Sequence, residues 1–190
     1  MTIRGKAHIA GAYEHPDREI PDKSVAQVHA EVALGAVADA GLSLSDVDAY
    51  FCAGDAPGFG PLSMADYLGL KRLRYLDSTE TGGSSSLVHV GHAAAAIAEG
   101  KCEIALITLG GLPRSRPVPR PSASALAPEA AFELPFGPTI VSMYALAARR
   151  HMHEYGTTSA PPPSLITQQS SRCSGSLIIG DSSTSSTVTG

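Results

Sequence analysis

An alternation of short β-rich segments with segments of helical periodicity runs through residues 6–109, and it restricts the fold of this chain more than any other feature. Extended segments are predicted at residues 6–13, 47–53, 74–77 and 103–109, and helices at residues 24–41, 63–70 and 84–99. The segment 103–109 is continuously apolar, which is typical of a strand covered on both faces. Because strands that alternate with helices form parallel sheets between helical layers, the pattern predicts a layered α/β fold with a mainly parallel sheet.

The helix predicted at residues 24–41 has both a start signal and a stop signal. Gln27 follows Ser24 by three residues, which is the spacing of a capping box. Apolar residues recur behind this pair with the 3.6-residue period of an amphipathic helix. Gly41 supplies a residue at which such helices end.

Two changes in composition after this α/β region predict three regions in all. Residues 1–111 form the core. Residues 112–156 begin with a proline-rich extended excursion as far as residue 135 and continue as a helix that has Pro138 at its first position. In residues 157–190 about half of the side chains are Ser or Thr, with a single short apolar island. Because such a composition does not offset its ordering entropy, a disordered tail is predicted there.

Composition also excludes several classes of function. The net charge of −4 argues against a basic surface for nucleic acid. Three cysteines without a C-x-x-C pair argue against a disulfide scaffold or a cysteine zinc site, and favour a cytoplasmic location. The apolar runs are too short to span a bilayer, and no apolar region follows the charges at the N-terminus as in a signal peptide, so no membrane partner is expected.

The segment most able to carry chemistry is Ser-Thr-Glu-Thr-Gly-Gly-Ser-Ser-Ser at residues 78–86, between a predicted strand and a predicted helix. Backbone N–H groups at a helix N-terminus favour anions and developing oxyanions, and the two glycines permit close approach of a ligand. The Gly-Lys-Ser/Thr ending of a phosphate-binding P-loop is missing. The alternative interpretation is that Ser84 only caps the helix.

The same segment begins a longer resemblance. Residues 82–107, from Gly-Gly-Ser-Ser-Ser through the alanine-rich helix to the next strand, resemble the nucleophile loop, buried helix and following strand of the thiolase superfamily. Residues 143–157 resemble the loop-domain helix of its sterol-carrier-protein (lipid-transfer) branch, and the resemblance extends over residues 1 to about 158. It implies the N-terminal half of a thiolase-like layered α/β/α fold with part of the loop domain. It also implies acyl-coenzyme A esters as substrates or ligands, with no permanently bound cofactor, and a homodimer.

Two departures from the family pattern change the expected chemistry. Gly83 stands where thiolases carry their acyl-accepting Cys, and glycine cannot hold an acyl group as a thioester. Ser84 and Ser85 are expected to be poor substitutes because no base is adjacent. Glu80 is a candidate base or orienting group, with a turn-stabilising carboxylate as the alternative. The remaining catalytic groups of the family belong to its C-terminal half, so we expect a truncated form that is inactive in thiolysis.

Three functions remain open after these departures. The first is a thiolase-like (acetyl-CoA acetyltransferase, lipid-transfer) protein that acts on or binds acyl-CoA esters. The second follows from relatives without the Cys, which include retro-aldol lyases that shorten CoA-linked side chains together with an OB-fold/zinc-ribbon partner. The third is a non-enzymatic binding or scaffold protein. Without its sister half, the chain is expected to expose an apolar face and therefore to aggregate or persist as an oligomer.

Four histidines form two close pairs. His89 and His92 are three residues apart on one predicted helix, where they could present two imidazoles on one face. Because no third ligand is in view, packing or a hydrogen bond is favoured over a metal pair, and no metal site is predicted. His151 and His153 are two apart on a helix and do not face each other, so solvated positions are expected.

Cysteines and arginines supply the remaining candidates. Cys52 lies near the end of a strand, where α/β sites gather, and Cys102 opens another strand; a small buried hydrophobe is the favoured role for both. Arginines stand among the prolines of the excursion, where they either meet coenzyme A phosphates or remain solvated, and both interpretations stay open. These arginines are Arg114, Arg116 and Arg120.

Overall fold

A computed structural model of the chain describes residues 3–53, 56–112, 114–115, 128, 130–137, 139–158 and 175–181. The chain divides into a core unit, Met1–Arg116 with Arg172–Gly190, and a second unit, Pro117–Ser171. Among the helices of the described residues, none is long and apolar enough to cross a membrane.

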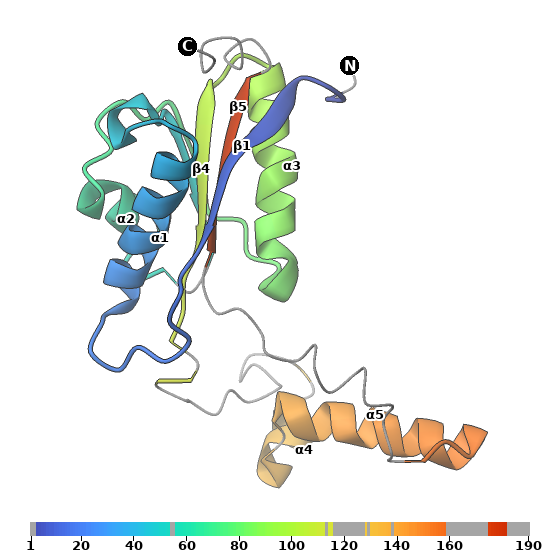
Figure 1. Ribbon diagram of the computed structural model, residues 1–190. Coiled ribbons are helices and arrows are strands. Elements are labelled where there is room, and N and C mark those ends of the chain that lie inside the picture. The colour runs from blue at the N-terminus through green and yellow to red at the C-terminus, as the bar shows by residue number, and fades with distance from the viewer. Residues whose placement is uncertain are drawn as a thin grey trace. The chain divides into compact units, whose positions relative to one another are not determined.

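A five-stranded mixed sheet forms the centre of the core unit (Figure 1). Its strands are β1 (Ala7–Glu14), β2 (Ala49–Cys52), β3 (Tyr75–Asp77), β4 (Ile104–Leu109) and β5 (Gly175–Asp181). Their order in the sheet is β1-β5-β4-β2-β3. Strand β2 pairs in parallel with β3 and β4, whereas β5 is antiparallel to both of its neighbours, β1 and β4. The predicted α/β fold is confirmed: β1, β2, β3 and β4 run in the same direction, and β5 runs against them.

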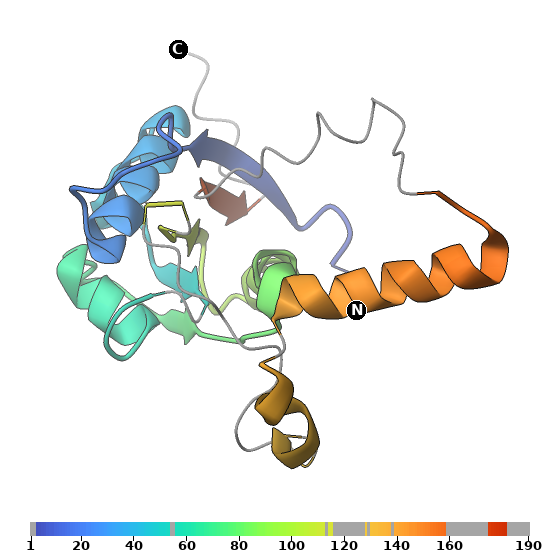
Figure 2. The ribbon, with the colours of Figure 1, turned by 90° about the horizontal axis from the view of Figure 1, so that it is seen from below.

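Helices cover both faces of this sheet (Figure 2). On one face lie α1 (Val25–Asp39) and α2 (Pro61–Tyr67), and on the other lies α3 (Ser85–Ala98). The predicted capping box of α1 is present: the Gln27 amide donates to Ser24 Oγ at 3.2 Å and the Ser24 amide donates to Gln27 Oε1 at 2.8 Å. A one-turn 3-10 helix at Leu44–Asp46, which the pattern did not predict, leads into β2.

The start of α2 differs from the prediction. The helix begins at Pro61 and ends at Tyr67, whereas residues 63–70 were expected. Gly60 precedes it with a φ of +62°, a left-handed conformation that few other residues adopt, and Pro61 occupies the first helical position. This glycine–proline pair therefore moves the helix two residues towards the N-terminus.

The strand β5 corrects the prediction for the end of the chain. Residues 157–190 were expected to be disordered, and this is wrong for residues 175–181, which pair with β1 on one side and β4 on the other. Ile178 packs beneath α1 and α2 and Ile179 beneath α3. A strand inside a sheet satisfies its backbone on both edges and buries both faces, so a short apolar island is sufficient. Residues 159–174 and 182–190 lie outside the described residues.

The second unit contains α4 (Ala130–Glu133), a 3-10 turn at Leu134–Phe136 and α5 (Ile140–Tyr155). The expected extended excursion, which was to reach residue 135, is therefore wrong at residues 130–135. Helix α5 also begins later than expected, at Ile140, because Thr139 is its N-cap and accepts a 3.2 Å hydrogen bond from the Ser142 amide. The helix ends at Gly156, whose φ is +65°. The predicted division into regions with boundaries at residues 111 and 156 stays a prediction.

Candidate active site

The segment singled out in the sequence lies at the carboxyl edge of the parallel strands. Strand β3 ends at Asp77, a 3-10 turn forms at Gly82–Ser84, and α3 starts at Ser85. Open α/β sheets bind ligands at this edge. The N-terminus of α3, a helix of 14 residues, carries the positive end of its dipole to the same place.

Glu80 holds the turn before α3 together. Its Oε1 accepts a 2.7 Å hydrogen bond from the Gly82 amide and lies 3.0 Å from Ser85 Oγ. Ser85 Oγ in turn accepts the Thr81 amide at 2.9 Å. Gly82 has a φ of +68°, so glycine is needed there. The geometry fits the turn-stabilising role of Glu80, and a direct part in chemistry stays a prediction.

The three small residues of the turn differ in accessibility. Gly83 is exposed, and a Cβ added to it would meet no atom of the described residues within 4 Å. Ser84 is exposed and its hydroxyl donates towards Thr81. Ser85 is only 1% exposed. The expectation that no base adjoins these hydroxyls is wrong for Ser85, because Glu80 lies beside it, but burial keeps this hydroxyl away from a substrate carbonyl.

His92 and Asp77 form a close pair that joins α3 to the end of β3. His92 Nδ1 lies 2.6 Å from Asp77 Oδ2, and Asp77 Oδ1 accepts both the amide (2.8 Å) and the hydroxyl (2.7 Å) of Thr79. Burial raises the pKa of Asp77, but the hydrogen bonds from Thr79 and His92 outweigh it and hold this pKa below its usual value. Asp77 was not recognised in the sequence, although an acidic residue at the end of a predicted parallel strand is a usable signal.

His89 lies one turn before His92 and faces the sheet. It is 1% exposed, and its ring lies 5.8 Å from that of Phe51 between centroids. Burial lowers the pKa of His89, while Asp77 and the backbone of Thr79 act in the opposite direction. Its Nε2 has no hydrogen-bond partner among the described groups. The favoured interpretation of this histidine pair as packing and hydrogen bonding agrees with these contacts.

No group of three or more side chains able to hold a metal ion occurs among the described residues. Cys52 is the last residue of β2, whereas Cys102 lies two residues before β4 rather than opening it as expected. Both are buried, and burial raises the pKa of each thiol to about 11. His151 and His153 are exposed on α5, as expected. Arg114 is exposed, whereas the other two arginines of the excursion, Arg116 and Arg120, lie outside the described residues.

A buried set of hydrogen-bonded side chains on the α1 side of the sheet was not predicted from the sequence. Thr108 Oγ1 lies 2.7 Å from Tyr50 Oη and 2.8 Å from His29 Nδ1, which joins β2 and β4 to α1. Burial raises the pKa of Tyr50. Gly110 passes so close to the His29 ring that an added Cβ would lie 2.6 Å from it. These partners come from distant segments, so no local signal identifies them.

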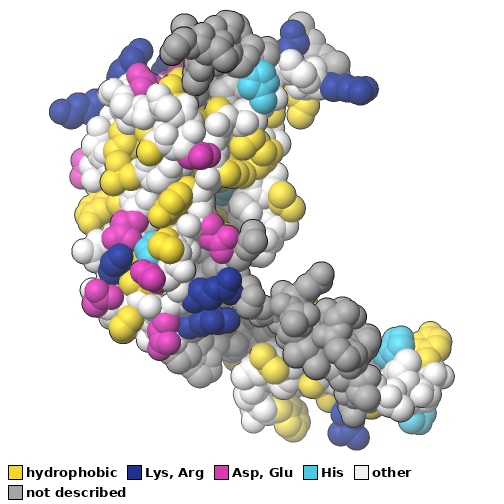
Figure 3. All heavy atoms as spheres, viewed as in Figure 1, with side chains coloured by type: hydrophobic (Ala, Val, Ile, Leu, Met, Phe, Trp, Pro, Cys, Tyr) yellow, Lys and Arg dark blue, Asp and Glu magenta, His cyan; other side chains and the backbone are white. Residues whose placement is uncertain are grey.

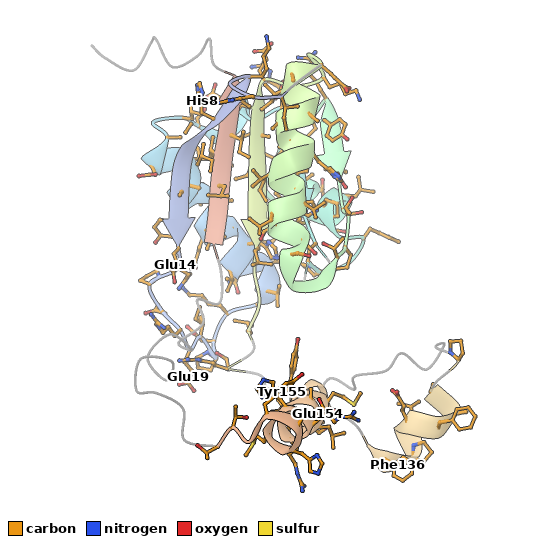
Figure 4. All side chains as sticks on the ribbon, turned by 90° about the vertical axis from the view of Figure 1, so that its right-hand side faces the viewer. His8, Glu14, Glu19, Phe136, Glu154 and Tyr155 are labelled. Carbon is orange, nitrogen blue, oxygen red and sulfur yellow. The ribbon has the colours of Figure 1, made fainter. Side chains whose placement is uncertain are left out.

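A mainly apolar groove lies beside α3. This open groove of about 370 Å³ runs between the first turn of α3 and the sheet, lined by Ala12, Tyr13, Glu14, Ser86, Ile107, Leu109 and Leu177. In Figure 4, β1, which runs from His8 towards Glu14, and β5 lie beside α3 rather than behind it. On the face of the core unit seen in Figure 3, acidic and basic side chains lie intermixed.

Comparison with known proteins identifies thiolase-like relatives. A steroid side-chain-cleaving aldolase of Thermomonospora curvata is 32% identical over 169 residues, 83% of this chain and 42% of that protein. An acetyl-CoA acetyltransferase of Methanothermobacter thermautotrophicus is 31% identical over 157 residues, 79% of this chain and 40% of that protein. The chain thus spans less than half the length of these relatives. No protein-family model matches it.

Solved structures give the same result for the fold. The Ltp2-ChsH2(DUF35) aldolase superposes with a TM-score of 0.74 and 25% identity, over 95% of this chain and 56% of that one. An acetyl-CoA acetyltransferase from Syntrophomonas wolfei superposes with a TM-score of 0.56 over 95% of this chain and 65% of that one; at 12% identity it shows the fold alone. The fold is therefore thiolase-like, and the homologues and structural neighbours of the chain are thiolase-like proteins.

Proposed function

We propose that the chain is part of an aldolase-type carbon–carbon lyase that shortens CoA-linked side chains by retro-aldol cleavage. The observation that carries the proposal is the turn before α3. Gly83 has no side chain that could accept an acyl group. Ser85 is 1% exposed, and its hydroxyl is hydrogen-bonded to the Thr81 amide and to Glu80. Thiolysis needs a covalent thioester on the enzyme, whereas a retro-aldol reaction does not.

The chemistry requires electrostatic stabilisation rather than a nucleophile. A base takes the proton of the β-hydroxyl, the Cβ–O bond becomes a carbonyl, and the Cα–Cβ bond breaks. Its electron pair passes to the α-carbon as a thioester enolate, which a proton then quenches. The positive end of α3 at Gly82–Ser85 is suited to stabilise the enolate oxygen.

The similarity of the chain to two aldolases supports the proposed lyase function. The Thermomonospora relative is named for steroid side-chain cleavage, and the neighbour with a TM-score of 0.74 is an aldolase of two named components. We therefore propose acyl-CoA esters as substrates, a homodimer, and an OB-fold/zinc-ribbon protein as partner. We expect the remaining catalytic groups either in the partner or in a region that corresponds to the part of the relatives outside the aligned residues.

A second candidate is binding of acyl-CoA without chemistry. The observation that favours it is the network around Glu80, whose Oε1 is already engaged with Gly82 and Ser85. The thiolytic acetyltransferase is the least supported of the three functions, because it needs the thiol that Gly83 replaces.

The test uses the 190-residue chain, alone and with a DUF35-type partner. It is incubated with a 3-hydroxyacyl-CoA bearing a tertiary hydroxyl, and separately with a 3-ketoacyl-CoA plus free coenzyme A. Chromatography with mass detection should find a ketone and the shortened acyl-CoA from the first substrate and no thiolytic product from the second. Thiolytic product would overturn the proposal, and binding of both esters without any product would favour the second candidate.

A further inference from the structure

Thr79 is tied to α3 through Asp77 and His92. One oxygen of the Asp77 carboxylate accepts the amide and the hydroxyl of Thr79. The other oxygen lies 2.6 Å from His92 Nδ1. The pair therefore connects the segment after β3 to α3.

We propose that His92 is a positioning residue that, through Asp77, fixes Thr79 and the Glu80–Ser85 turn at the start of α3. The inference rests on the proposed function only in treating this turn as the site. His92 does not need to touch substrate, because it reaches Thr79 through the Asp77 carboxylate.

The pair that holds Thr79 is shielded from solvent on the Asp77 side. The Asp77 side chain is 14% exposed, whereas that of His92 is 43% exposed. A carboxylate with so little access to water depends on its hydrogen-bond donors. Loss of His92 should therefore leave Asp77, and with it Thr79, less firmly held.

The position of Thr79 sets the geometry of the turn after it. Glu80 is the next residue, and its carboxylate binds the Gly82 amide and Ser85 Oγ. If Thr79 is no longer held, the backbone before Glu80 is free to move. The Gly82 and Thr81 amides then lose the fixed positions of their acceptors, Glu80 Oε1 and Ser85 Oγ. The turn would then loosen although α3 and the sheet remain folded.

Hydrogen exchange on the full chain tests this, with the amides of Thr79, Thr81 and Gly82 as reporters. In His92→Leu these amides should exchange about tenfold faster or more, the effect expected for loss of a hydrogen bond to a charged group. His92→Gln, which keeps a donor, should restore protection. His8→Leu, at an exposed position on β1 (Figure 4), is the matched control and should change none of them.

Two outcomes would overturn the proposal. One is unchanged exchange in the turn in His92→Leu. The other is faster exchange spread evenly over α3 and β2 with a lower unfolding midpoint, which marks a residue that only fills space. If the wild-type chain shows lyase activity, His92→Leu should lower kcat with little change in KM, and His92→Gln should recover it. If it shows none, the proposed function fails while the exchange result still decides the role of His92.

Discussion

Leu106 of β4 and Ile178 of β5 lie opposite each other in an antiparallel pair, and both side chains are fully buried beneath α1 and α2. Strand β5 follows the second unit in sequence, yet it lies between β1 and β4 in the sheet. Strand β1 meets the sheet through β5. A segment near residue 180 therefore completes a core that otherwise comes from the first 110 residues.

The contribution of β5 can be measured with Ile178→Ala. This change should lower the free energy of unfolding by about 2–5 kcal/mol, the usual cost of truncating a fully buried isoleucine. Urea unfolding followed by circular dichroism provides the measurement. Ile9→Ala is the control, because Ile9 is 56% exposed on β1 and its loss should cost far less. Equal effects of the two changes would mean that residues 175–181 do not belong to the core.

Position 83 should accept a thiol without gaining thiolase activity. In Gly83→Cys the new side chain enters open space, so the protein should fold with wild-type stability. Iodoacetamide at neutral pH should label this thiol well before Cys52 and Cys102, because burial raises the pKa of those two thiols to about 11. Peptide mapping by mass spectrometry locates the adducts.

The same variant should show no turnover of 3-ketoacyl-CoA with coenzyme A, because thiolysis also needs acid–base groups and the carboxylate of the turn, Glu80, is engaged with the Gly82 amide and Ser85 Oγ. Robust turnover, or an acyl adduct on Cys52 or Cys102, would show that the nucleophile position is misplaced.

Stability should depend on pH through His89, which faces Asp77, Glu80 and His92. Burial lowers its folded-state pKa below the ordinary value of 6.5, so the unfolded chain takes up the proton first as the pH falls. The contribution of neutral His89 to the free energy of unfolding is fully present above about pH 6.5. As the pH falls from that value to the lowered pKa, this contribution declines by at most about 1.4 kcal/mol for each pH unit.

His89→Leu should remove this part of the decline when unfolding free energies are compared at pH 7 and pH 5. Asp77 does not interfere, since its pKa is also lowered and its contribution is lost only below the ordinary value of 3.8. An identical decline in wild type and variant would assign the pH dependence to other groups.

Self-association should follow from the uncovered side of the sheet. Ile9 shares a sheet face with Ile179, on the α3 side, and remains 56% exposed, while Leu87 on α3 is 74% exposed. We expect the isolated chain to sediment as an oligomer or to aggregate. The double variant Ile9→Lys, Leu87→Lys should shift it towards monomer, whereas Leu34→Lys on α1 should not. A wild-type chain that sediments as a stable monomer contradicts this expectation.

Local patterns were sufficient for elements whose signals lie within one segment. The capping box of α1 and the turn before α3 depend on residues at most five apart, such as Glu80 and Ser85. The pairing of Asp77 with His92 was harder to predict, because neither local segment indicates its partner. Only the packing of α3 against the sheet brings His92 Nδ1 to 2.6 Å from Asp77 Oδ2.

The sequence by itself therefore determined the alternation of strands and helices, the turn at Glu80–Ser85 and the absence of a thiol at Gly83, because these are properties of neighbouring residues. Tertiary structure alone decided that the segment 175–181 is a strand and that His92 lies beside Asp77. The physical reason is the same in both cases. A short apolar segment within a polar-rich region gains enough from ordering only when β1 and β4 bind both of its edges, and an imidazole acquires its partner only when α3 docks on the sheet.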